Sequence, residues 1–392
     1  MNEWPIIKLN ALVDAVTVGH VGPMANEYVP AGIPFLRSQN VEPFRLNLEG
    51  VKYISPSFHA RLGKSSISHG DVVIVRTGQP GTCAVVPQTL PVANCSDLIV
   101  VKPGKNVDAR WLAYYINIAG HEFVASRLVG AVQQHFNIGS AREMKLQVPP
   151  LVEQRAIADL LGAIDDKIES NREKGKISAR YVDAVFVRFA RYPSREGSIG
   201  ELLLNYREKV GQRNQQVIVM SATASGTLVP SDEFFKKQVY SKSIEKYLVV
   251  PQWSFAYNPS RINIGSIGLN EGPTSGAVSP VYVVAKAQAA PSARWIDQCL
   301  KTDAVKDQIS SFATGSVRQV LRFDDFASIK IPMVDPAAMT DFYCEIDPLI
   351  RLRDQVRIET LSLIQFRDAL LPDLLSGRIR VPNAPESVEA TQ

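Results

Sequence analysis

The feature that most constrains this 392-residue chain is a sequence pattern that it contains twice. Around residue 130, a Gly–small–Val–polar–Gln segment precedes a short apolar run ending in proline and then a long helical pattern; the same succession starts again around residue 315. The segments 109–112 (ARWL) and 293–296 (ARWI) extend the likeness upstream in each copy. A repeat this long predicts two related domains in tandem rather than a solenoid of short units.

Each copy divides into a globular part and a helical part. The globular parts are rich in glycine, proline and short β-branched runs, such as 70–76 (GDVVIVR), which predicts a turn followed by a buried strand. A helix is expected over 108–125 with Asp108 as its N-cap, and a matching helix after Ser292 with that residue as cap. We therefore predict a mixed α/β (α+β) fold.

The helical part of the first copy predicts a coiled-coil helix. Between Leu151 and Arg191 there is no proline, and apolar residues recur at alternating spacings of three and four. This is the seam pattern of a two-stranded coiled coil. Three small or polar residues interrupt the stripe, so we expect loose packing or a bend at Asn171, Gly175 and Ser178.

The second copy has a similar stripe from Asp341 to Leu375, where Pro372 is expected to kink or end the helix. Such a long helix between globular domains cannot bury its own stripe, and the simplest partner is the other copy in antiparallel orientation. The alternative is that each helix packs onto its own domain. The predicted organisation is 1–150 and 198–335 for the globular domains, 151–197 and 336–380 for the helices, and 381–392 for a disordered tail.

Composition supports a cytoplasmic globular protein. Hydrophobic residues make up 45% and charged residues 21% of the chain, and the formal net charge of +4 is compatible with nucleic acid. Neither a signal peptide nor a membrane-spanning run is recognised. Scattered cysteines without a CxxC pair argue against a disulfide framework or a zinc site; they are Cys83, Cys95, Cys299 and Cys344.

Two segments resemble cofactor-binding motifs without completing them. Residues 61–66 (RLGKSS) look like the end of a phosphate loop, but Phe58 stands where that loop needs its first glycine. Residues 258–261 (NPSR) begin like the Asn-Pro-Pro-aromatic motif of adenine methyltransferases. Here Arg261 replaces the aromatic residue that would stack on a flipped base.

One catalytic alternative stays open. Glu143 and Lys145 have the Glu-x-Lys spacing of many magnesium-dependent nucleases, although no Pro-Asp dipeptide precedes them at a suitable distance. A self-sufficient nuclease is therefore an alternative function. His59 and His69 lie in a polar, turn-rich region without a neighbouring glutamate, which favours turn residues over a metal-binding pair.

Polar residues next to glycine follow several predicted strands, at matching places in both copies. Arginine pairs with guanine, and glutamine or asparagine with adenine, while glycine lets the backbone approach phosphate. Together these loops predict a DNA-binding surface. Its candidate residues are Arg37, Gln39, Asn40, Arg76, Thr77, Gln79, Gln133, Gln134, His135, Asn137, Arg261, Asn263, Ser266, Ser316, Arg318 and Gln319.

The chain resembles the specificity subunit of type I restriction-modification systems over nearly its whole length. The likeness rests on Gly130 with Gln133, on 148–154 (VPPLVEQ) with Ile157, and on 367–379 (RDALLPDLLSGRI). The second copy departs from the Pro-Pro-Leu-x-Glu-Gln pattern, since it has 332–335 (PMVD) at that place.

The resemblance implies two target recognition domains, each reading half of a split DNA sequence, and an antiparallel helix pair with pseudo-two-fold symmetry between them. It implies a non-catalytic chain without a cofactor, bound to double-stranded DNA, two methyltransferase subunits and motor-nuclease subunits. S-adenosylmethionine, ATP and magnesium would belong to those partners. The partner contacts it suggests are Glu153, Gln154, Ile157, Leu370 and Leu374. A coiled-coil scaffold that does not read DNA sequence is the remaining alternative.

Overall fold

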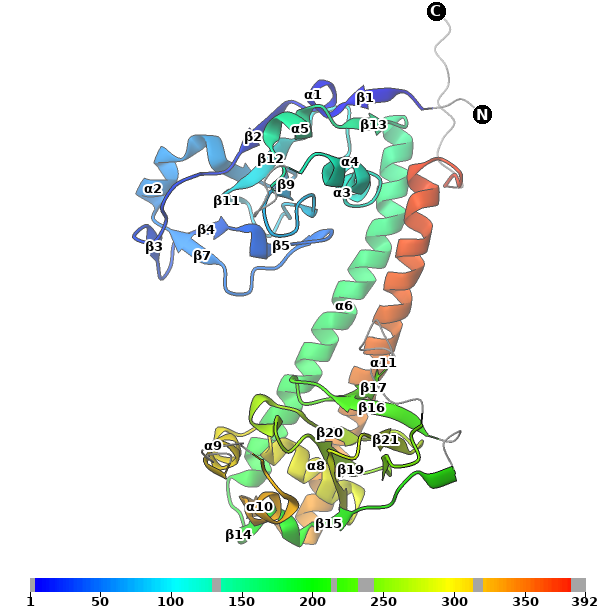
Figure 1. Ribbon diagram of the computed structural model, residues 1–392. Helices are drawn as coiled ribbons and strands as arrows, with labels where there is room; N and C mark the ends of the chain where they lie inside the picture. The colour runs from blue at the N-terminus through cyan, green and yellow to red at the C-terminus, as the bar shows by residue number, and fades with distance from the viewer. Residues whose placement is uncertain (1–3, 129–134, 213–216, 232–242, 313–319, 382–392) are drawn as a thin grey trace, which may run out of the picture. The chain divides into compact units, whose positions relative to one another are not determined.

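The structure is a computed structural model that describes residues 4–128, 135–212, 217–231, 243–312 and 320–381. The chain forms two compact units. The N-terminal unit comprises Met1–Asn171 with Ile358–Gln392, and the C-terminal unit comprises Arg172–Arg357. Two helices of 40 residues each, α6 (Leu151–Ala190) and α11 (Pro336–Leu375), contribute residues to both units (Figure 1).

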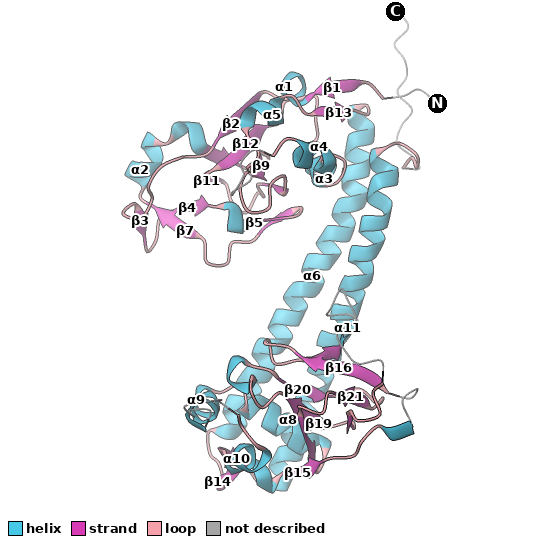
Figure 2. Ribbon diagram, in the orientation of Figure 1, coloured by secondary structure: helices cyan, strands magenta, loops and turns pink. Residues whose placement is uncertain are grey.

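The N-terminal unit contains two larger sheets (Figure 2). The first is antiparallel throughout, in the order β10 (Cys83–Val85), β9 (Val72–Val75), β12 (Leu98–Lys102) and β2 (Ala15–Val18). The second has the order β3 (Tyr28–Val29), β7 (Lys52–Ile54), β4 (Ile33–Leu36), β11 (Val92–Cys95) and β8 (Ser66–Ser68), with β4 and β11 parallel. Two short pairs complete the unit: β1 (Ile6–Lys8) with β13 (Lys145–Gln147), and β5 (Val41–Glu42) with β6 (Arg45–Leu46).

The predicted turn and buried strand at 70–76 are confirmed. Gly70 has a φ of 88°, a left-handed conformation that glycine adopts without steric cost, and all four residues of β9 are buried. The helix predicted over 108–125 is instead two helices, α3 (Ala109–Asn117) and α4 (His121–Ser126). Asn117 is the last residue of the first helix, and its amide group bonds to the backbone of Cys83.

Asp108 caps α3 as predicted, accepting hydrogen bonds from the backbone nitrogens of Arg110 and Trp111. The other helices of the unit are short: α1 (Leu9–Leu12), α2 (Pro56–Arg61), α5 (Ile138–Arg142) and the 3-10 turns η1 (Ser38–Asn40) and η2 (Gly63–Ser65). The hydrophobic core is closed by both long helices. Ile157 of α6 and Leu374 of α11 pack in one cluster with Trp111, which is fully buried.

The C-terminal unit also contains two four-stranded sheets. The first has the order β20 (Ile267–Asn270), β19 (Ser254–Tyr257), β22 (Val283–Ala287) and β15 (Leu203–Tyr206). The second has the order β17 (Leu228–Pro230), β16 (Ile218–Ala222), β21 (Gly276–Val278) and β18 (Leu248–Val250). A further pair joins β14 (Arg195–Ser198) to β23 (Lys330–Met333).

Sheet topology confirms the tandem repeat. The order β10-β9-β12-β2 corresponds to β20-β19-β22-β15, with antiparallel neighbours in both. The parallel pair β4–β11, followed by antiparallel β8, corresponds to β16–β21 followed by β18. In each unit a strand near its start pairs with the strand that leads into a long helix.

Besides its parts of α6 and α11, the described helices of the C-terminal unit are α8 (Ala290–Cys299), α9 (Asp303–Phe312), α10 (Phe323–Ser328) and the 3-10 turns η3 (Ile199–Glu201) and η5 (Ile262–Ile264). The N-cap predicted at Ser292 is wrong: α8 starts after Ala289, without a side-chain cap, and Ser292 is buried inside it. Pro291 explains the shift, because its fixed φ suits the first turn of a helix and it lacks the N–H that a cap would bond.

The long helices run antiparallel within each unit. In the N-terminal unit, Asp165 of α6 pairs with Arg367, and Glu153 near the start of α6 pairs with Arg380 just beyond α11. In the C-terminal unit, α6 and α11 meet through an ion pair between Arg188 and Glu345. The helix pairing predicted from the apolar stripes is therefore confirmed in each unit, together with packing of each helix onto its neighbouring sheets.

The interruption predicted in the apolar stripe of α6 contains polar side chains that are buried. Asn171 and Ser178 are almost fully buried, and Asn171 Nδ2 donates to Glu359 Oε2 at 2.8 Å. Helix α11 ends at Leu375, so Pro372, which was expected to kink or end it, does not itself end the helix. Gly377 follows the last turn with a φ of 73°, and a side chain there would meet the Trp4 ring.

Candidate nucleic-acid interface

Polar loops of the N-terminal unit meet where β4, β9 and β11 end. The backbone N–H of Ser96, just after β11, donates to the carbonyl of Leu36 at the end of β4. The next residue, Asp97, donates its N–H to the carbonyl of His20. Strand ends that lie side by side in a sheet thus bring together segments that are distant in sequence.

Arg76 is held by hydrogen bonds to two other segments. It follows β9, its Nη1 donates to Asp97 Oδ1 at 2.6 Å, and its Nε donates to the carbonyl of Phe136 at 3.4 Å. The Phe136 N–H returns a hydrogen bond to the carbonyl of Arg76. The Arg76 side chain is only 16% exposed, so it lies in a fixed position rather than extending into solvent.

Thr77 and His135 belong to the same cluster. The Thr77 hydroxyl donates to Asp97 Oδ2 at 3.3 Å, and Thr77 forms an antiparallel bridge with His135. Gly78 follows with a φ of 97°, and Gln79 is exposed beyond it. The structure therefore brings together candidate residues that the sequence separates, from the loop after β9 and from the segment before α5.

The loop after β4 contributes differently. Gln39 is exposed, whereas Asn40 is 1% exposed and its side chain is used inside the loop. Its Oδ1 accepts from the backbone of Arg37, and its Nδ2 donates to the carbonyl of Asn47. Asn40 thus shapes this loop. Asn137 likewise has a local task, because its Oδ1 caps α5 by accepting from the Ser140 N–H at 2.8 Å.

In the C-terminal unit the candidate loop joins β19 to β20. Arg261 and Asn263 are exposed there, whereas Ser266 is buried and donates to the carbonyl of Ala222 at 3.3 Å. Gly265 has a φ of 90°, and a side chain there would meet the Ala224 carbonyl oxygen at 2.3 Å. The loop is therefore pressed against the end of β16, which leaves its other side, with Arg261, towards solvent.

A cavity of about 420 Å³ adjoins this loop. Phe255, Ile262 and Ile309 contribute apolar surface, and Lys301 and Lys306 also line it. The remaining candidates, Gln133, Gln134, Ser316, Arg318 and Gln319, lie outside the described residues.

The residues expected to contact partner subunits are mostly internal in the N-terminal unit. Ile157 and Leu374 are 1% exposed in the core of the N-terminal unit, and Leu370 packs against it. Gln154 is equally buried, because it bonds the backbone of Asp108, Asn106 and Pro149. Glu153 forms an ion pair with Arg380. These side chains join α6 and α11 to the domain, and they leave little surface for another protein.

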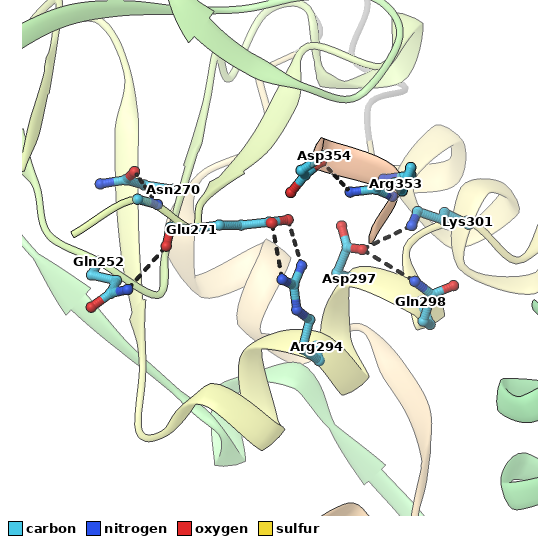
Figure 3. A network of polar contacts seen from close by, with 10 residues as sticks. Gln252, Asn270, Glu271, Arg294, Asp297, Gln298, Lys301, Arg353 and Asp354 are labelled. Atoms are coloured by element: carbon cyan, nitrogen blue, oxygen red, sulfur yellow. Dashed lines mark hydrogen bonds and ion pairs between the residues drawn. The ribbon is translucent and has the colours of Figure 1, made fainter. Parts of the chain in front are cut away.

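A buried charge network in the C-terminal unit was not foreseen from sequence (Figure 3). Arg294 of α8 is 3% exposed and binds both carboxylate oxygens of Glu271, which follows β20. Burial alone would lower the pKa of Arg294, but the hydrogen bonds and charge of Glu271 outweigh it and raise the pKa. Gln252 holds the Glu271 carbonyl at 3.0 Å, so the network connects α8 to the sheet.

The residues of the nuclease alternative do not form a metal site. Glu143 is exposed and bonded to Lys8 at 2.7 Å, a contact that lowers its pKa. Within the described residues, no three His, Cys, Asp or Glu side chains are placed to hold a metal ion. In the same part of the chain, no helix is long and apolar enough to cross a membrane.

Comparisons with known proteins by sequence match part of the chain. Residues 3–178 match the family model of the type I restriction modification DNA specificity domain. A putative type I restriction enzyme specificity subunit (MjaX) of Methanocaldococcus jannaschii is 22% identical over 221 residues; the match covers 51% of this chain and only half of that relative's length.

A solved structure supports the architecture along nearly the whole chain. The S subunit of a type I restriction-modification system from M. genitalium superposes with a TM-score of 0.66, covering 95% of this chain and 96% of that one. The sequence identity is 15%, so this likeness establishes the fold.

Proposed function

We propose that the whole chain is the DNA sequence-recognition subunit of a type I restriction-modification system, because residues 3–178 match the family model of the type I restriction modification DNA specificity domain. Each unit reads one half of a bipartite target in double-stranded DNA. The paired helices α6 and α11 set the distance between the two half-sites. The chain itself performs no chemistry.

The observation that carries this proposal is the repeated sheet order with unlike loops. The loop after β9 carries Arg76 and Thr77, and the corresponding loop after β19 carries Arg261 and Asn263. One scaffold thus presents two different sets of hydrogen-bonding side chains. Hydrogen-bonding side chains distinguish base edges in the major groove, so two different sets of them read two different short sequences. A DNA target with two unlike half-sites therefore fits this molecule best.

Catalysis belongs to partner subunits in this proposal. Two methyltransferase subunits supply adenine methylation with S-adenosylmethionine, and motor-nuclease subunits supply ATP- and magnesium-dependent cleavage. The ion pair of Glu143 with Lys8 gives the nuclease alternative no support within this chain. In this proposal the chain acts in the cytoplasm, because the DNA that it binds is located there.

The test is selection from a randomised duplex DNA library. The purified full chain, alone and mixed with methyltransferase subunits from the same cells, is incubated with the library, and bound duplexes are sequenced. We expect one motif of two short half-sites separated by a fixed, unspecified spacer. Enrichment of no motif, with folded protein in both samples, would contradict the proposal and favour a coiled-coil scaffold. Magnesium-dependent cutting by the chain alone that is lost in Glu143→Ala would favour the nuclease.

A further inference from the structure

We propose that Asp97 is a positioning residue that fixes Arg76 and Thr77 for sequence reading by the N-terminal unit. The inference rests on the proposed function and adds the residue on which the specificity of one half-site depends. Asp97 does not itself touch DNA in this proposal. It acts by holding the two side chains that do.

The geometry around Asp97 is that of a clamp. Its two carboxylate oxygens accept from different residues, Arg76 Nη1 at 2.6 Å and Thr77 Oγ1 at 3.3 Å. Its backbone has a φ of 52°, which is uncommon for residues other than glycine, and its N–H is bonded to the His20 carbonyl. The neighbouring Ser96 N–H is bonded to the carbonyl of Leu36. The backbone at Ser96 and Asp97 is thus held by the end of β4 in the second sheet and by His20, which follows β2 of the first sheet.

The clamp leaves part of the Arg76 guanidinium available. Nε and Nη1 are bonded to Phe136 and Asp97, while Nη2 has no hydrogen-bond partner among the described residues. A long side chain that becomes ordered only on binding loses rotamer freedom at that step, and a side chain that is already ordered does not. Asp97 orders Arg76 before DNA binds, and it limits the guanidinium to one direction of approach.

The C-terminal unit has no such clamp in its described part. Arg261 is exposed there, without a described ion pair, and the connection 279–282 (SPVY), at the place of Ser96–Asp97, contains no carboxylate. Tyr282 occupies it instead, and its hydroxyl accepts from the Ala222 N–H at 3.4 Å. Loss of the Asp97 carboxylate should therefore affect one half-site only.

Two substitutions separate the carboxylate from the backbone. Asp97→Gly removes the clamp and keeps a residue that adopts a positive φ without strain. Asp97→Asn keeps the shape and tolerates the same backbone conformation, but loses the charge. Asp71→Asn is the matched control. Asp71 precedes β9, whereas Arg76 follows it, and Asp71 forms a comparable clamp with the Ser68 N–H and Lys102 Nζ.

The experiment repeats the library selection with the full chain carrying each variant, after thermal unfolding has shown that each is folded. For Asp97→Gly we expect the preference for the favoured base at one or two positions of one half-site to fall about 2- to 10-fold, with a smaller fall for Asp97→Asn. The other half-site and the Asp71→Asn variant keep the wild-type motif.

Three results would overturn the inference. An Asp97→Gly motif identical to wild type removes the positioning role. Equal loss in both half-sites, or the same loss in Asp71→Asn, makes Asp97 a residue of general stability. In each of these outcomes, the motif that the wild-type chain enriches still supports the proposed function. If the wild-type chain enriches no motif, the proposed function fails and the inference fails with it.

Discussion

The two units share a sheet order but hold their candidate DNA-reading arginines in opposite ways. Arg76 is clamped between Asp97 and the Phe136 carbonyl, while Arg261 is exposed on a loop that other residues, such as Asn258 and Ser266, hold in shape. The same strand end therefore supports a preorganised contact in one unit and an adaptable one in the other. Sheet topology restricts where the loops emerge, and loop residues decide how rigid they are.

The units also bind the long helices with different chemistry. In the N-terminal unit, α11 is fastened by arginines: Arg367 lies 4.4 Å from the Phe44 ring and bonds Asp165, and Arg380 lies over Trp4. In the C-terminal unit the helices close an aromatic cluster, in which Trp295 packs against Phe186 and Phe342 at centroid distances of 5.1 and 5.2 Å. Both junctions bury apolar side chains, and the N-terminal one adds contacts of arginines with aromatic rings.

The buried tryptophans give the largest expected effect. Trp111 and Trp295 occupy matching helices and are both fully buried, so replacing either with alanine should lower the free energy of unfolding by about 3–5 kcal/mol. Trp295→Ala should cost about 1 kcal/mol more, because Trp295 Nε1 donates to the Pro332 carbonyl, while Trp111 Nε1 has no described partner. Urea denaturation measures the loss, and hydrogen exchange shows which unit opens.

Phenylalanine substitutions serve as the control for that pair. Trp111→Phe and Trp295→Phe keep most of the volume, so the difference between them isolates the hydrogen bond to Pro332. Equal losses for the two phenylalanine variants would show that this bond contributes nothing to the comparison.

The helix junctions should respond unequally to loss of one arginine. Arg367→Ala leaves the partly buried Asp165 carboxylate without its ion-pair partner, although Tyr114 still donates a hydrogen bond to it. This substitution should lower the free energy of unfolding by about 2–3 kcal/mol. Arg188→Ala, in the C-terminal unit, breaks a more exposed pair with Glu345 and should cost about 0–1 kcal/mol. Denaturation midpoints test this, and a larger loss for Arg188→Ala would reverse the contrast between the two junctions.

Alanine substitutions of the two candidate DNA-reading arginines should affect DNA binding alike and protein stability differently. Arg261→Ala should weaken specific DNA binding by about 1–3 kcal/mol and change unfolding by no more than about 0.5 kcal/mol, because its side chain has no described ion pair to lose. Arg76→Ala should weaken binding similarly, and should also destabilise the N-terminal unit, since Asp97 loses its partner. Fluorescence anisotropy on the selected duplex, with thermal unfolding beside it, distinguishes the two. Identical unfolding of both variants would contradict the clamp.

Local signals made part of the fold predictable from sequence. The stripe after Leu151, the Asp108 cap and the turn at Gly70 depend on residues a few positions apart, and the structure contains all three. The cap predicted at Ser292 failed because a competing local signal, Pro291, starts the helix earlier. The repeat was readable because the same topology must bury the same positions in both copies, such as Trp111 and Trp295.

Contacts between distant segments were not predictable in the same way. Asp97 meets Arg76 only because β9 and the end of β11 approach each other, and Arg367 meets Asp165 across two helices. The resemblance suggested Gln154 as a partner contact, and no local pattern indicated that its amide bonds the loop before α3. Such pairings depend on tertiary packing, for which a single sequence carries no residue-level signal.

The smallest expected effect concerns the pH dependence of stability at two short helices, η3 in the C-terminal unit and α1 in the N-terminal unit. In the C-terminal unit, Glu201 Oε1 accepts from the Ser198 N–H at 2.8 Å and pairs with Arg195, and these hydrogen bonds lower the pKa of Glu201 from 4.5 to about 2. In the N-terminal unit, the corresponding helix follows Lys8 without a side-chain cap. A lowered pKa means that the contribution to stability is complete above the ordinary pKa and is lost as the pH falls from about 5 towards 2. Glu201→Gln should therefore be less stable than the wild type at pH 6, and the difference in denaturation midpoint should vanish near pH 2. A difference that stays constant over this range would show that the carboxylate charge does not distinguish the two short helices.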